Sequence, residues 1–476
     1  MINRRHFLRQ LGLAAAAAAC PAAAQSDAAP LTGRRPNIVF IMTDDQGLGD
    51  MGWTGHPHIR TPGLDALRRQ SLWFSDFQVS PTCAPTRCAI MTGRHEFYSG
   101  VTHTIFERER MSLKAFTLPQ ALKSAGYATG IFGKWHLGDE DAYQPGRRGF
   151  DEVFIHGSGG IGQTYPGSCG DVPNNDYFNP VIRHNGTFER TKGFCTDIFF
   201  DRALAWIDAR RKTGEPFFCY LTPNAPHAPY RAPEKWKKRH VDAGLDDDAA
   251  GFCGMVENID WNVGQLLARL DEWKLSENTL VLFLGDNGTC QRRLFDGGMR
   301  GGKGSPFQGG TRVGLLARWP GTLPTDVACP ALTAHIDLFP TFCALAGARP
   351  PADKKLDGRS LLPLFANPQA PWEDRTLFTH VGRWKPGTDP DASKFKECAV
   401  RTARFRFDNN AALYEVASDP MEKTDVAAKY PEEVARLRAA YDAWWADVRP
   451  CMENENPQNV PAQNPFKTAY WQQFGL

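Results

Sequence analysis

The sequence predicts an α/β fold in which a large mixed, mostly parallel sheet is flanked by helices. Four short runs are apolar at nearly every position, which is typical of strands buried on both faces. Segments with apolar residues at three-to-four spacing, typical of helices that cover a sheet, lie between them. The apolar runs are residues 37–42, 127–132, 216–221 and 279–284, and the helical segments are residues 61–70, 118–125, 197–211 and 255–273.

Each of the four predicted strands leads directly into polar residues. The first is followed by Asp44-Asp45, the second by Lys134-Trp135-His136, the third by a loop that contains His227, and the fourth by Asp286-Asn287. Ligands of open α/β sheets bind beyond the carboxyl ends of the strands. We therefore expect these residues, far apart in the sequence, to meet in one cleft.

The pattern of strands and helices changes at three places along the chain. Residues 151–193 are rich in Gly, Pro, Asn and Asp, which predicts a long loop bordering the cleft. A smaller α+β subdomain is expected to follow the catalytic domain, with strands at 398–401 and 405–407 and a helix at 431–448. The expected divisions are a signal peptide at 1–24, a catalytic domain at 35–370, the subdomain at 371–450 and a C-terminal arm at 451–476.

The composition of the 476-residue chain is that of a soluble globular protein, with 42% hydrophobic and 23% charged residues. Its formal net charge is only +2, so the overall charge gives no indication of a nucleic-acid partner. No uninterrupted apolar run is long enough for a membrane-spanning helix, and we predict no membrane span.

The N-terminus has the pattern of an export signal. Arg4-Arg5 precedes a short apolar stretch that ends in small residues at Ala22-Ala23-Ala24. This pattern predicts a twin-arginine signal peptide, with a mature protein that begins near Gln25 and works in the periplasm or outside the cell. Two alternatives remain open at this point, namely a lipoprotein anchored through Cys20 and a disordered alanine-rich tail.

The chain has 12 cysteines, and none of the ten besides Cys20 and Cys83 forms a close C-x-x-C pair, so a zinc site is not expected. Export permits disulfides, and Cys169 with Cys195 is the one pairing suggested by their positions on either side of a loop-rich stretch. Cys219 and Cys343 lie in apolar runs and are expected to be buried thiols.

The stretch from Pro81 to Gly93 predicts an anion site. Pro85 suits the first turn of a helix, which places Cys83 at the helix N-terminus. Backbone N–H groups and the helix dipole favour an anion there, and Arg87, one turn on, can direct its guanidinium to the same place. Taken by itself, the stretch is equally consistent with a plain structural cysteine.

Cys83-x-Pro85-x-Arg87, followed by Thr92-Gly93-Arg94, closely resembles the signature of the type I sulfatases of the alkaline-phosphatase-like superfamily. The resemblance runs from about residue 35 to residue 450, with the motifs in the family's order. The further motifs are Asp44-Asp45-Gln46-Gly47, Gly133-Lys134-Trp135-His136-Leu137-Gly138, Pro226-His227-Ala228-Pro229, Gly285-Asp286-Asn287-Gly288, Gly301-Gly302-Lys303-Gly304, Leu413-Tyr414-Glu415-Val416 and Asp419-Pro420-Met421-Glu422.

The resemblance implies hydrolysis of aryl or carbohydrate sulfate esters, with Cys83 converted to formylglycine by a formylglycine-generating maturation enzyme. It also favours calcium as the metal, and oxygen ligands from two strand ends suit a hard cation in any case. For an isolated Asp-Gly, the alternative interpretation is an acidic turn residue that caps a helix and binds no metal. The implied metal ligands are Asp44, Asp45, Cys83, Asp286 and Asn287.

The implied catalytic residues are Cys83, Arg87, Lys134, His136, His227 and Lys303. By resemblance, Lys134, His227 and Lys303 contact the sulfate, and Arg87 stabilises its developing charge. The leaving alcohol takes a proton from His227 or Lys303. His136 acts as the base that releases sulfate from the hydrated aldehyde. Lys134 and His136 are two residues apart, and on an extended segment both would point to one side.

Two departures from the family pattern follow Lys303. Gln308 replaces a frequent glutamate in Gln308-Gly309-Gly310-Thr311-Arg312, and Gly314 replaces a common proline. Both are expected to affect loop support rather than the reaction.

The closest alternative activity is that of a phosphonate monoester or phosphodiester hydrolase of the same superfamily, and a non-catalytic glycan-binding relative is the next. The sequence does not name the sulfate ester. Trp53, His103, the 151–193 loop, Arg383 and Trp384 are the residues expected at the entrance, where aromatic rings and arginines suit a sulfated sugar as well as an aryl sulfate.

Overall fold

The computed structural model describes residues 31–167, 169–454 and 464–476. The expected signal peptide, with Cys20, lies outside these residues, as does part of the expected C-terminal arm. In the described residues, no helix is long and apolar enough to cross a membrane.

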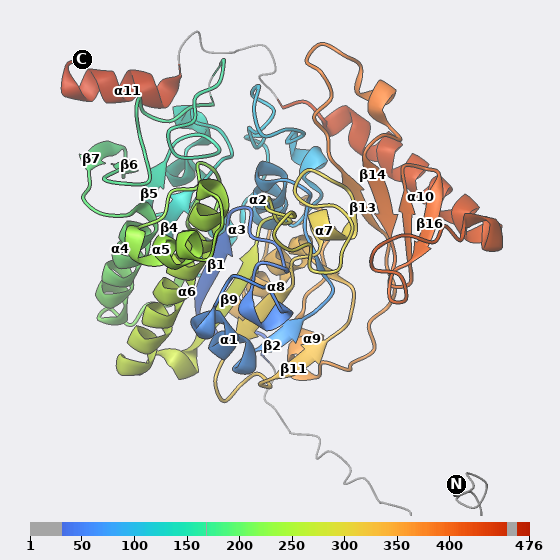
Figure 1. The fold of residues 1–476 in the computed structure, drawn as a ribbon, viewed down its shortest axis with the longest axis horizontal. Helices are drawn as coiled ribbons and strands as arrows, with labels where there is room; N and C mark the ends of the chain where they lie inside the picture. The colour runs from blue at the N-terminus through green and yellow to red at the C-terminus, as the bar shows by residue number, and fades with distance from the viewer. Residues whose placement is uncertain (1–30, 168, 455–463) are drawn as a thin grey trace, which may run out of the picture.

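The molecule is built on a ten-stranded sheet with the strand order β11-β2-β10-β9-β1-β8-β4-β5-β6-β7 (Figure 1). The five strands from β9 to β5 are parallel, whereas β10, β6 and β7 pair antiparallel with their neighbours. The mixed, mostly parallel sheet expected from the sequence is therefore confirmed. The strands are β1 Asn37–Thr43, β2 Leu72–Phe74, β4 Ala128–Lys134, β5 Glu152–His156, β6 Val181–His184, β7 Thr187–Arg190, β8 Phe217–Thr222, β9 Thr279–Gly285, β10 Leu315–Arg318 and β11 Val327–Cys329.

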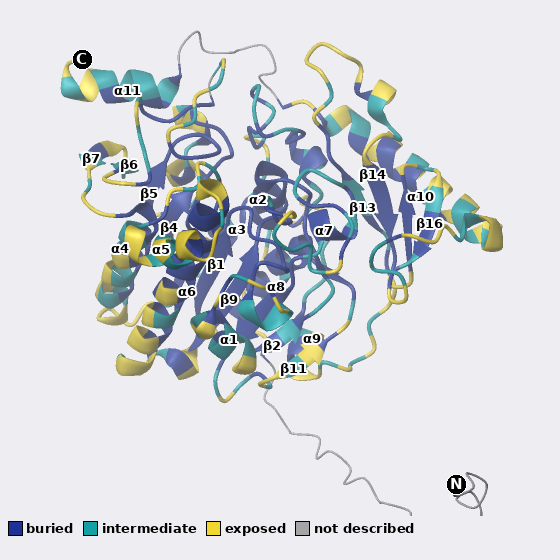
Figure 2. Ribbon diagram, in the orientation of Figure 1, coloured by how far each residue is buried: buried dark blue, intermediate teal, exposed yellow. Residues whose placement is uncertain are grey.

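Helices cover both faces of this sheet, and the central strand β1 shows why its sequence is apolar throughout. Ile38, Phe40 and Met42 belong to a core shared with α2, α3 and α8 on one face. Val39 and Ile41 belong to a second core, shared with α1, α4 and α6 on the other face. All seven residues of β1 are buried, and Figure 2 shows the central strands as the buried interior. The helices are α1 Pro62–Arg69, α2 Cys83–Thr92, α3 Leu118–Ser124, α4 Cys195–Arg211, α5 Glu234–Asp242, α6 Asp247–Glu272, α7 Gln308–Thr311, α8 Leu338–Ala346 and α9 Leu362–Ala366.

A smaller unit follows, with a four-stranded antiparallel sheet in the order β13-β14-β15-β16. Helix α10 (Pro431–Val448) packs on it and buries Trp444 and Trp445 in a separate aromatic core. Helix α11 (Pro465–Phe474) returns to the far edge of the large sheet, where Phe466 and Tyr470 pack against Phe188 of β7. The strands of the small sheet are β13 Leu377–His380, β14 Cys398–Arg401, β15 Phe405–Asp408 and β16 Ala412–Glu415, and β3 Phe77–Gln78 pairs with β12 Thr333–Ala334 in a two-stranded sheet.

The structure corrects two expectations. Residues 151–193 are not one long loop, because they contain β5 and the hairpin of β6 and β7. The hairpin strands have only four residues each and are partly exposed, so they lack an apolar pattern. The turn Asn185-Gly186, with φ of 48° and 93°, was the available sequence signal.

The second correction concerns the disulfide expected between Cys169 and Cys195. Both are free thiols. Cys169 Sγ lies 3.3 Å from Ser158 Oγ, and Cys195 Sγ donates to Asn224 Oδ1 at 3.3 Å. The two cysteines bracket the same stretch of sequence, but the fold gives each a different partner.

Candidate active site

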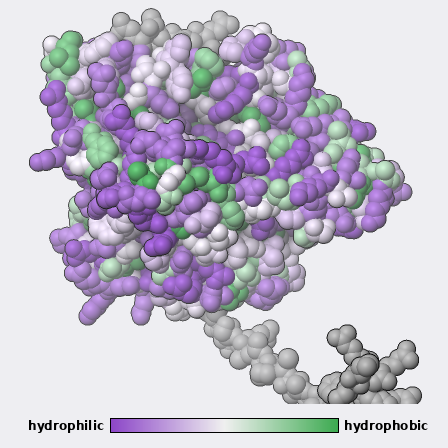
Figure 3. All heavy atoms as spheres, in the orientation of Figure 1, coloured by the Kyte–Doolittle hydropathy of each residue, from purple (hydrophilic) through white to green (hydrophobic). Residues whose placement is uncertain are grey.

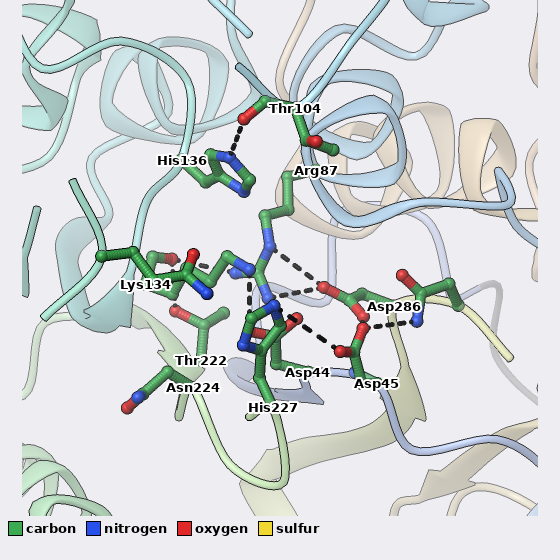
Figure 4. Close-up of polar contacts among 12 residues, drawn as sticks. Asp44, Asp45, Arg87, Thr104, Lys134, His136, Thr222, Asn224, His227 and Asp286 are labelled. Atoms are coloured by element: carbon green, nitrogen blue, oxygen red, sulfur yellow. Dashed lines mark hydrogen bonds and ion pairs between the residues drawn. The ribbon is translucent and has the colours of Figure 1, made fainter. Parts of the chain in front are cut away.

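The four strands with polar ends are neighbours in the sheet, in the order β9-β1-β8-β4, and all run parallel. Their carboxyl ends therefore open at one edge, where the close-up in Figure 4 shows Asp44, Asp286, Lys134 and His227 gathered around Arg87. The expected convergence of these sequence-distant residues is confirmed.

Asp44, Asp45, Asp286 and Asn287 form the carboxylate-rich floor of this site. Asp45 N–H donates to Asp286 Oδ1 at 3.1 Å, and Asn287 Nδ2 donates to Asp45 Oδ1 at 2.9 Å. All four side chains are buried, with at most 1% of their surface exposed. The ends of β1 and β9 are thus held together by the acidic residues themselves.

Cys83 is the first residue of α2, as the position of Pro85 predicts, and its side chain is buried. Ligand atoms of Asp44, Cys83 and Asp286 all lie within 4.8 Å of one another. Although burial raises the pKa of the Cys83 thiol, the nearby Lys134 and Lys303 lower it below its usual value. The position therefore favours an anionic oxygen or sulfur at the helix N-terminus.

The donor set fits a hard divalent cation. Asp44 Oδ1 and Asn287 Oδ1 are buried oxygens without a hydrogen-bond partner, and such atoms are costly unless a ligand satisfies them. Burial raises the pKa of Asp44 to about 6, and burial with the adjacent Asp44 charge raises that of Asp286 to about 6. A bound cation would relieve this repulsion, and oxygen ligands are those that Ca²⁺ and Mg²⁺ prefer.

Arg87 lies beneath the acidic floor rather than in open space. Its Nε and Nη2 donate to Asp286 Oδ2 at 3.2 and 2.7 Å, and its Nη1 donates to the Lys134 carbonyl at 2.9 Å. The side chain is fully buried. In this geometry Arg87 orients Asp286 and the end of β4.

Two lysines bring positive charge to the site, each paired with a different carboxylate. Lys134 Nζ donates to Asp44 Oδ2 at 2.7 Å, and Lys303 Nζ donates to Asp45 Oδ2 at 2.7 Å. Burial opposes the charge of both lysines, but the carboxylates prevail and raise their pKa values. In spite of its burial, the pKa of Asp45 is held far below its usual range by Lys303 and His227.

His136 reaches the site through a turn of the backbone. Its φ is 60°, so the extended segment ends at Lys134 and His136 lies in the turn beyond the strand. His136 Nε2 lies 2.8 Å from the Thr104 carbonyl, which can only accept, so Nε2 carries the hydrogen. Nδ1 is buried and without a partner. The ring is therefore set to accept a proton at Nδ1.

His227 has the opposite arrangement of its ring nitrogens. Nδ1 lies 2.8 Å from the Ala228 carbonyl and so carries the hydrogen, while Nε2 faces Asp45 Oδ2 at 3.7 Å. Tyr177 OH holds this loop by donating to the Asn224 and His227 carbonyls at 3.0 and 2.5 Å. Burial and Lys303 lower the pKa of His227, whereas Asp45 opposes this change.

Several residues in and around the site were not expected from the sequence. Thr104 acts through its carbonyl, Tyr177 through its hydroxyl, and Cys290 Sγ contacts Asp45 Oδ2 at 3.0 Å. A backbone carbonyl gives no sequence signal. Cys290 follows the Asp286-Asn287 motif closely enough to have been noticed.

Two of the expected entrance residues contact Thr104, and a third contacts Arg108. Arg383 Nη2 donates to Thr104 Oγ1 at 3.0 Å, and His103 Nδ1 accepts from Thr104 N–H at 2.8 Å. The Trp384 carbonyl accepts from Arg108. Trp53 is partly buried and packs against the core that includes residues of α1. This contact does not support the expectation that Trp53 lies at the entrance.

The chain matches two family models. One is described as Sulfatase and covers residues 36–348. The other is described as N-sulphoglucosamine sulphohydrolase, C-terminal, and covers residues 303–440.

Comparison with individual proteins gives related matches. N-acetylgalactosamine-6-sulfatase of Canis lupus familiaris is 32% identical over 372 residues, which cover 73% of this chain and 69% of that protein. Arylsulfatase A of Homo sapiens is 30% identical over 456 residues, covering 85% and 87%. The crystal structure of Ps i-CgsB superposes with a TM-score of 0.78 at 27% identity, over 93% of this chain and 98% of that one.

Proposed function

This chain belongs to the sulfatase family and is a sulfuric ester hydrolase, and we propose that it acts through a formylglycine made from Cys83 with calcium as its metal. The observation that carries the proposal is the grouping of Asp44, Cys83 and Asp286, with ligand atoms within 4.8 Å of one another, at a helix N-terminus flanked by two lysines. An acidic cation site and an anion site thus share one residue, Cys83.

Asp44, Asp45, Asp286, Asn287 and residue 83 would hold the calcium ion. Calcium supplies Lewis-acid charge there, which lowers the pKa of a nearby hydroxyl and stabilises negative charge on sulfate oxygens. Formylglycine supplies a hydrated aldehyde, whose second hydroxyl lets the sulfate be expelled, a route that a plain cysteine or serine lacks. The sulfur atom of Cys83 marks the place of these hydroxyls.

The protein's own residues bind and orient the sulfate group. Lys134 and Lys303 lie next to the carboxylates that keep both ammonium groups charged, and both would contact the sulfate. His227 presents Nε2 to the same site, beside Asp45. Donors fixed in a buried site stabilise developing charge without reorganisation. Arg87 contributes by holding Asp286 in place.

Two groups of the chain handle the protons. His136 Nδ1, unpartnered and neutral, is the acceptor for the hydroxyl proton when sulfate is released. The leaving alcohol takes its proton from Lys303 Nζ, or from His227 Nε2 when that ring is in its doubly protonated form, and both groups lie against Asp45. The two histidines therefore serve different half-reactions.

The substrate is an aryl or carbohydrate sulfate ester. Relatives named for N-acetylgalactosamine 6-sulfate and aryl sulfate support this range, as does the solved complex of Ps i-CgsB with k-i-k-neocarrahexaose. A phosphonate monoester hydrolase of Agrobacterium radiobacter has the same fold at 19% identity and a TM-score of 0.58, which supports the fold alone.

We also propose that the protein acts in the periplasm or outside the cell. The support is the twin-arginine pattern of residues 1–24, with Cys20 as the site of the lipoprotein alternative. The twin-arginine route carries folded proteins, so a formylglycine-generating enzyme would have to act on Cys83 in the cytoplasm before export.

The test is to express the protein with and without a formylglycine-generating enzyme. We expect the peptide that spans Cys83 to carry an aldehyde only in the first sample, and only that sample to hydrolyse aryl sulfate. Calcium, not zinc, should restore an EDTA-treated sample. Aryl phosphonate should be hydrolysed more slowly than aryl sulfate.

Cys83→Ala should abolish turnover. The matched control is Cys88→Ala, a buried cysteine one turn along the same helix whose pKa is raised by burial, and it should leave activity in place. Full activity in a sample whose Cys83 is quantitatively alkylated would contradict the proposed nucleophile, and restoration by zinc alone would contradict the proposed metal.

A further inference from the structure

A cleft of about 660 Å³ opens beside Lys303, between the segment after β9 and the glycine-rich loop. In the part of the chain that the structure describes, every charged side chain that lines it is cationic, and these are Arg292, Arg293, Arg300 and Lys303. Among the described residues, none that lines the cleft carries a carboxylate side chain. Much of the surface seen in Figure 3 is hydrophilic, so it is the uniform sign of charge that distinguishes this cleft.

The cleft is continuous with the active site. Lys303 and Cys290 both line it, and both contact Asp45 Oδ2, through Nζ at 2.7 Å and through Sγ at 3.0 Å. Lys303 N–H also donates to the Thr289 carbonyl at 3.1 Å, which joins the two walls of the cleft. A substrate whose sulfate lies against Lys303 would therefore extend its neighbouring groups into this space.

Three of the four cations already have partners within the protein. Lys303 is paired with Asp45, and Arg293 Nη2 donates to Asp246 Oδ1 at 2.8 Å. Arg300 lies over the Phe307 ring at 3.8 Å. The described residues include no hydrogen-bond or ion-pair partner for the Arg292 guanidinium, and this side chain is exposed.

The stem of Arg292 is fixed against the loop that carries Lys303. A Cβ placed on Gly302 would lie 2.7 Å from Arg292 Cδ and 2.8 Å from the Thr289 carbonyl oxygen. Glycine at position 302 thus lets the arginine stem lie directly on the loop backbone. This contact places the arginine stem beside the loop that carries Lys303, while its guanidinium stays free for a ligand.

We propose that Arg292 binds a second anionic group of the substrate, so that the preferred substrate is a glycan with a further sulfate ester or carboxylate near the sulfate that is hydrolysed. A guanidinium matches the planar, two-oxygen face of either group with paired hydrogen bonds. This inference rests on the proposed function, because it concerns the substrate of the same site.

The test compares two neighbouring arginines that line the same cleft and carry the same charge. Arg292→Ala removes the free guanidinium, and Arg293→Ala removes the one already paired with Asp246. The substrates are an aryl sulfate, a singly sulfated oligosaccharide, its multiply sulfated counterpart, and a singly sulfated oligosaccharide that contains a uronate. The last two distinguish a second sulfate from a carboxylate.

Arg292→Ala should lower kcat/KM about tenfold or more on substrates with a second anionic group, as expected for the loss of a charge-assisted hydrogen bond. Its turnover of aryl sulfate should be unchanged. Arg293→Ala should leave all substrates nearly unaffected, and Arg292→Lys should restore part of the loss. Equal losses in both alanine variants, or an equal loss on aryl sulfate, would overturn the inference.

Binding provides a readout that does not depend on turnover. Calorimetry with the unmatured Cys83→Ala protein should show weaker binding of the multiply sulfated oligosaccharide when Arg292 is also replaced. A wild-type protein that hydrolyses no sulfate ester would contradict the proposed function. Intact aryl sulfatase activity together with binding that is independent of Arg292 would contradict this inference alone.

Discussion

At the residue scale, the two active-site histidines are oriented by main-chain carbonyls. His136 donates from Nε2 to Thr104 and His227 donates from Nδ1 to Ala228, so each ring keeps one nitrogen free. A carbonyl partner fixes the tautomer because it can only accept. For His136 the identity of the free nitrogen follows from a carbonyl 32 residues away in the sequence, whereas for His227 it follows from the carbonyl of the next residue.

The pH dependence of turnover tests this orientation at His136. Burial, and then the charge of Lys134, lower the pKa of His136 well below its usual value of 6.5. The ring is neutral above its folded pKa and loses its function as a base when it is protonated as the pH falls. We therefore expect the acid limb of kcat, measured on an aryl sulfate with saturating calcium, to lie below pH 6.5.

His136→Ala should lower kcat by about 10²- to 10⁴-fold, the usual effect of losing a general base. The remaining activity should no longer show that acid limb. An acid limb at or above pH 6.5 in the wild type, or an unchanged limb in the variant, would contradict the assignment of His136 as the base.

At the element scale, the strands that carry the site could be predicted because their sequences are apolar on both faces. Continuous burial leaves no polar position in β1, β8 or β9 except at their ends. The hairpin of β6 and β7 was not predicted because its short strands are partly exposed and therefore lack a continuous apolar sequence. Helix α6 begins at Asp247, earlier than expected, since Asp246 caps it by accepting from Ala249 N–H at 2.9 Å.

The loop after β5 packs directly on the catalytic ring. A Cβ on Gly159 would lie 2.5 Å from His136 Cε1 and 2.6 Å from Nε2, the atom that binds Thr104. Gly159→Ala should therefore displace the ring and lower kcat by at least about tenfold, since small misplacements of catalytic groups are costly. Circular dichroism should show that the fold is retained.

The matched control is the neighbouring Gly160→Ala. The three atoms nearest to its added Cβ all belong to the side chain of Gln163, at 2.8 Å or more, and that flexible side chain can move. Steady-state kinetics on aryl sulfate should show a much smaller loss for this variant. Equal kcat values in the two variants would show that the loop does not position His136.

At the scale of the whole molecule, ion pairs made by two buried arginines join the small unit to the body that holds the site. Arg401 of β14 pairs with Asp76 at 2.6 Å, and Arg375 pairs with Asp337 at 2.8 Å. Asp76 also accepts from Gln78, in the segment that leads to Cys83. The small unit therefore supports the segment before α2 as well as its own core.

Arg401→Ala should destabilise the protein by about 1.5–3 kcal/mol, the usual cost of losing a hydrogen bond to a charged group, because Asp76 is 17% exposed and keeps its hydrogen bond from Gln78. The side chain of Arg401 is 2% exposed. Arg404→Ala breaks a pair with Glu415 in which the arginine is 60% exposed, and it should cost no more than about 1 kcal/mol. Chemical denaturation measures both, and equal losses would contradict the joining role of Arg401.

The sequence by itself determined the fold class, the residues at the strand ends and the family, because continuous apolar runs and closely spaced motifs are local properties of the chain. It placed Cys83 at a helix N-terminus through Pro85, and the structure confirms this position. The charged residues of the site could be named for the same reason, since each stands inside a short motif.

Only the tertiary structure decided how those residues are used. The burial of Arg87 against Asp286, the free Nδ1 of His136 and the unpaired state of Arg292 depend on contacts between segments far apart in the sequence. Such contacts form when the sheet brings the strand ends together and the loops fold over them. Hydrogen-bond partners and burial are therefore properties of the folded chain, and no local pattern encodes them.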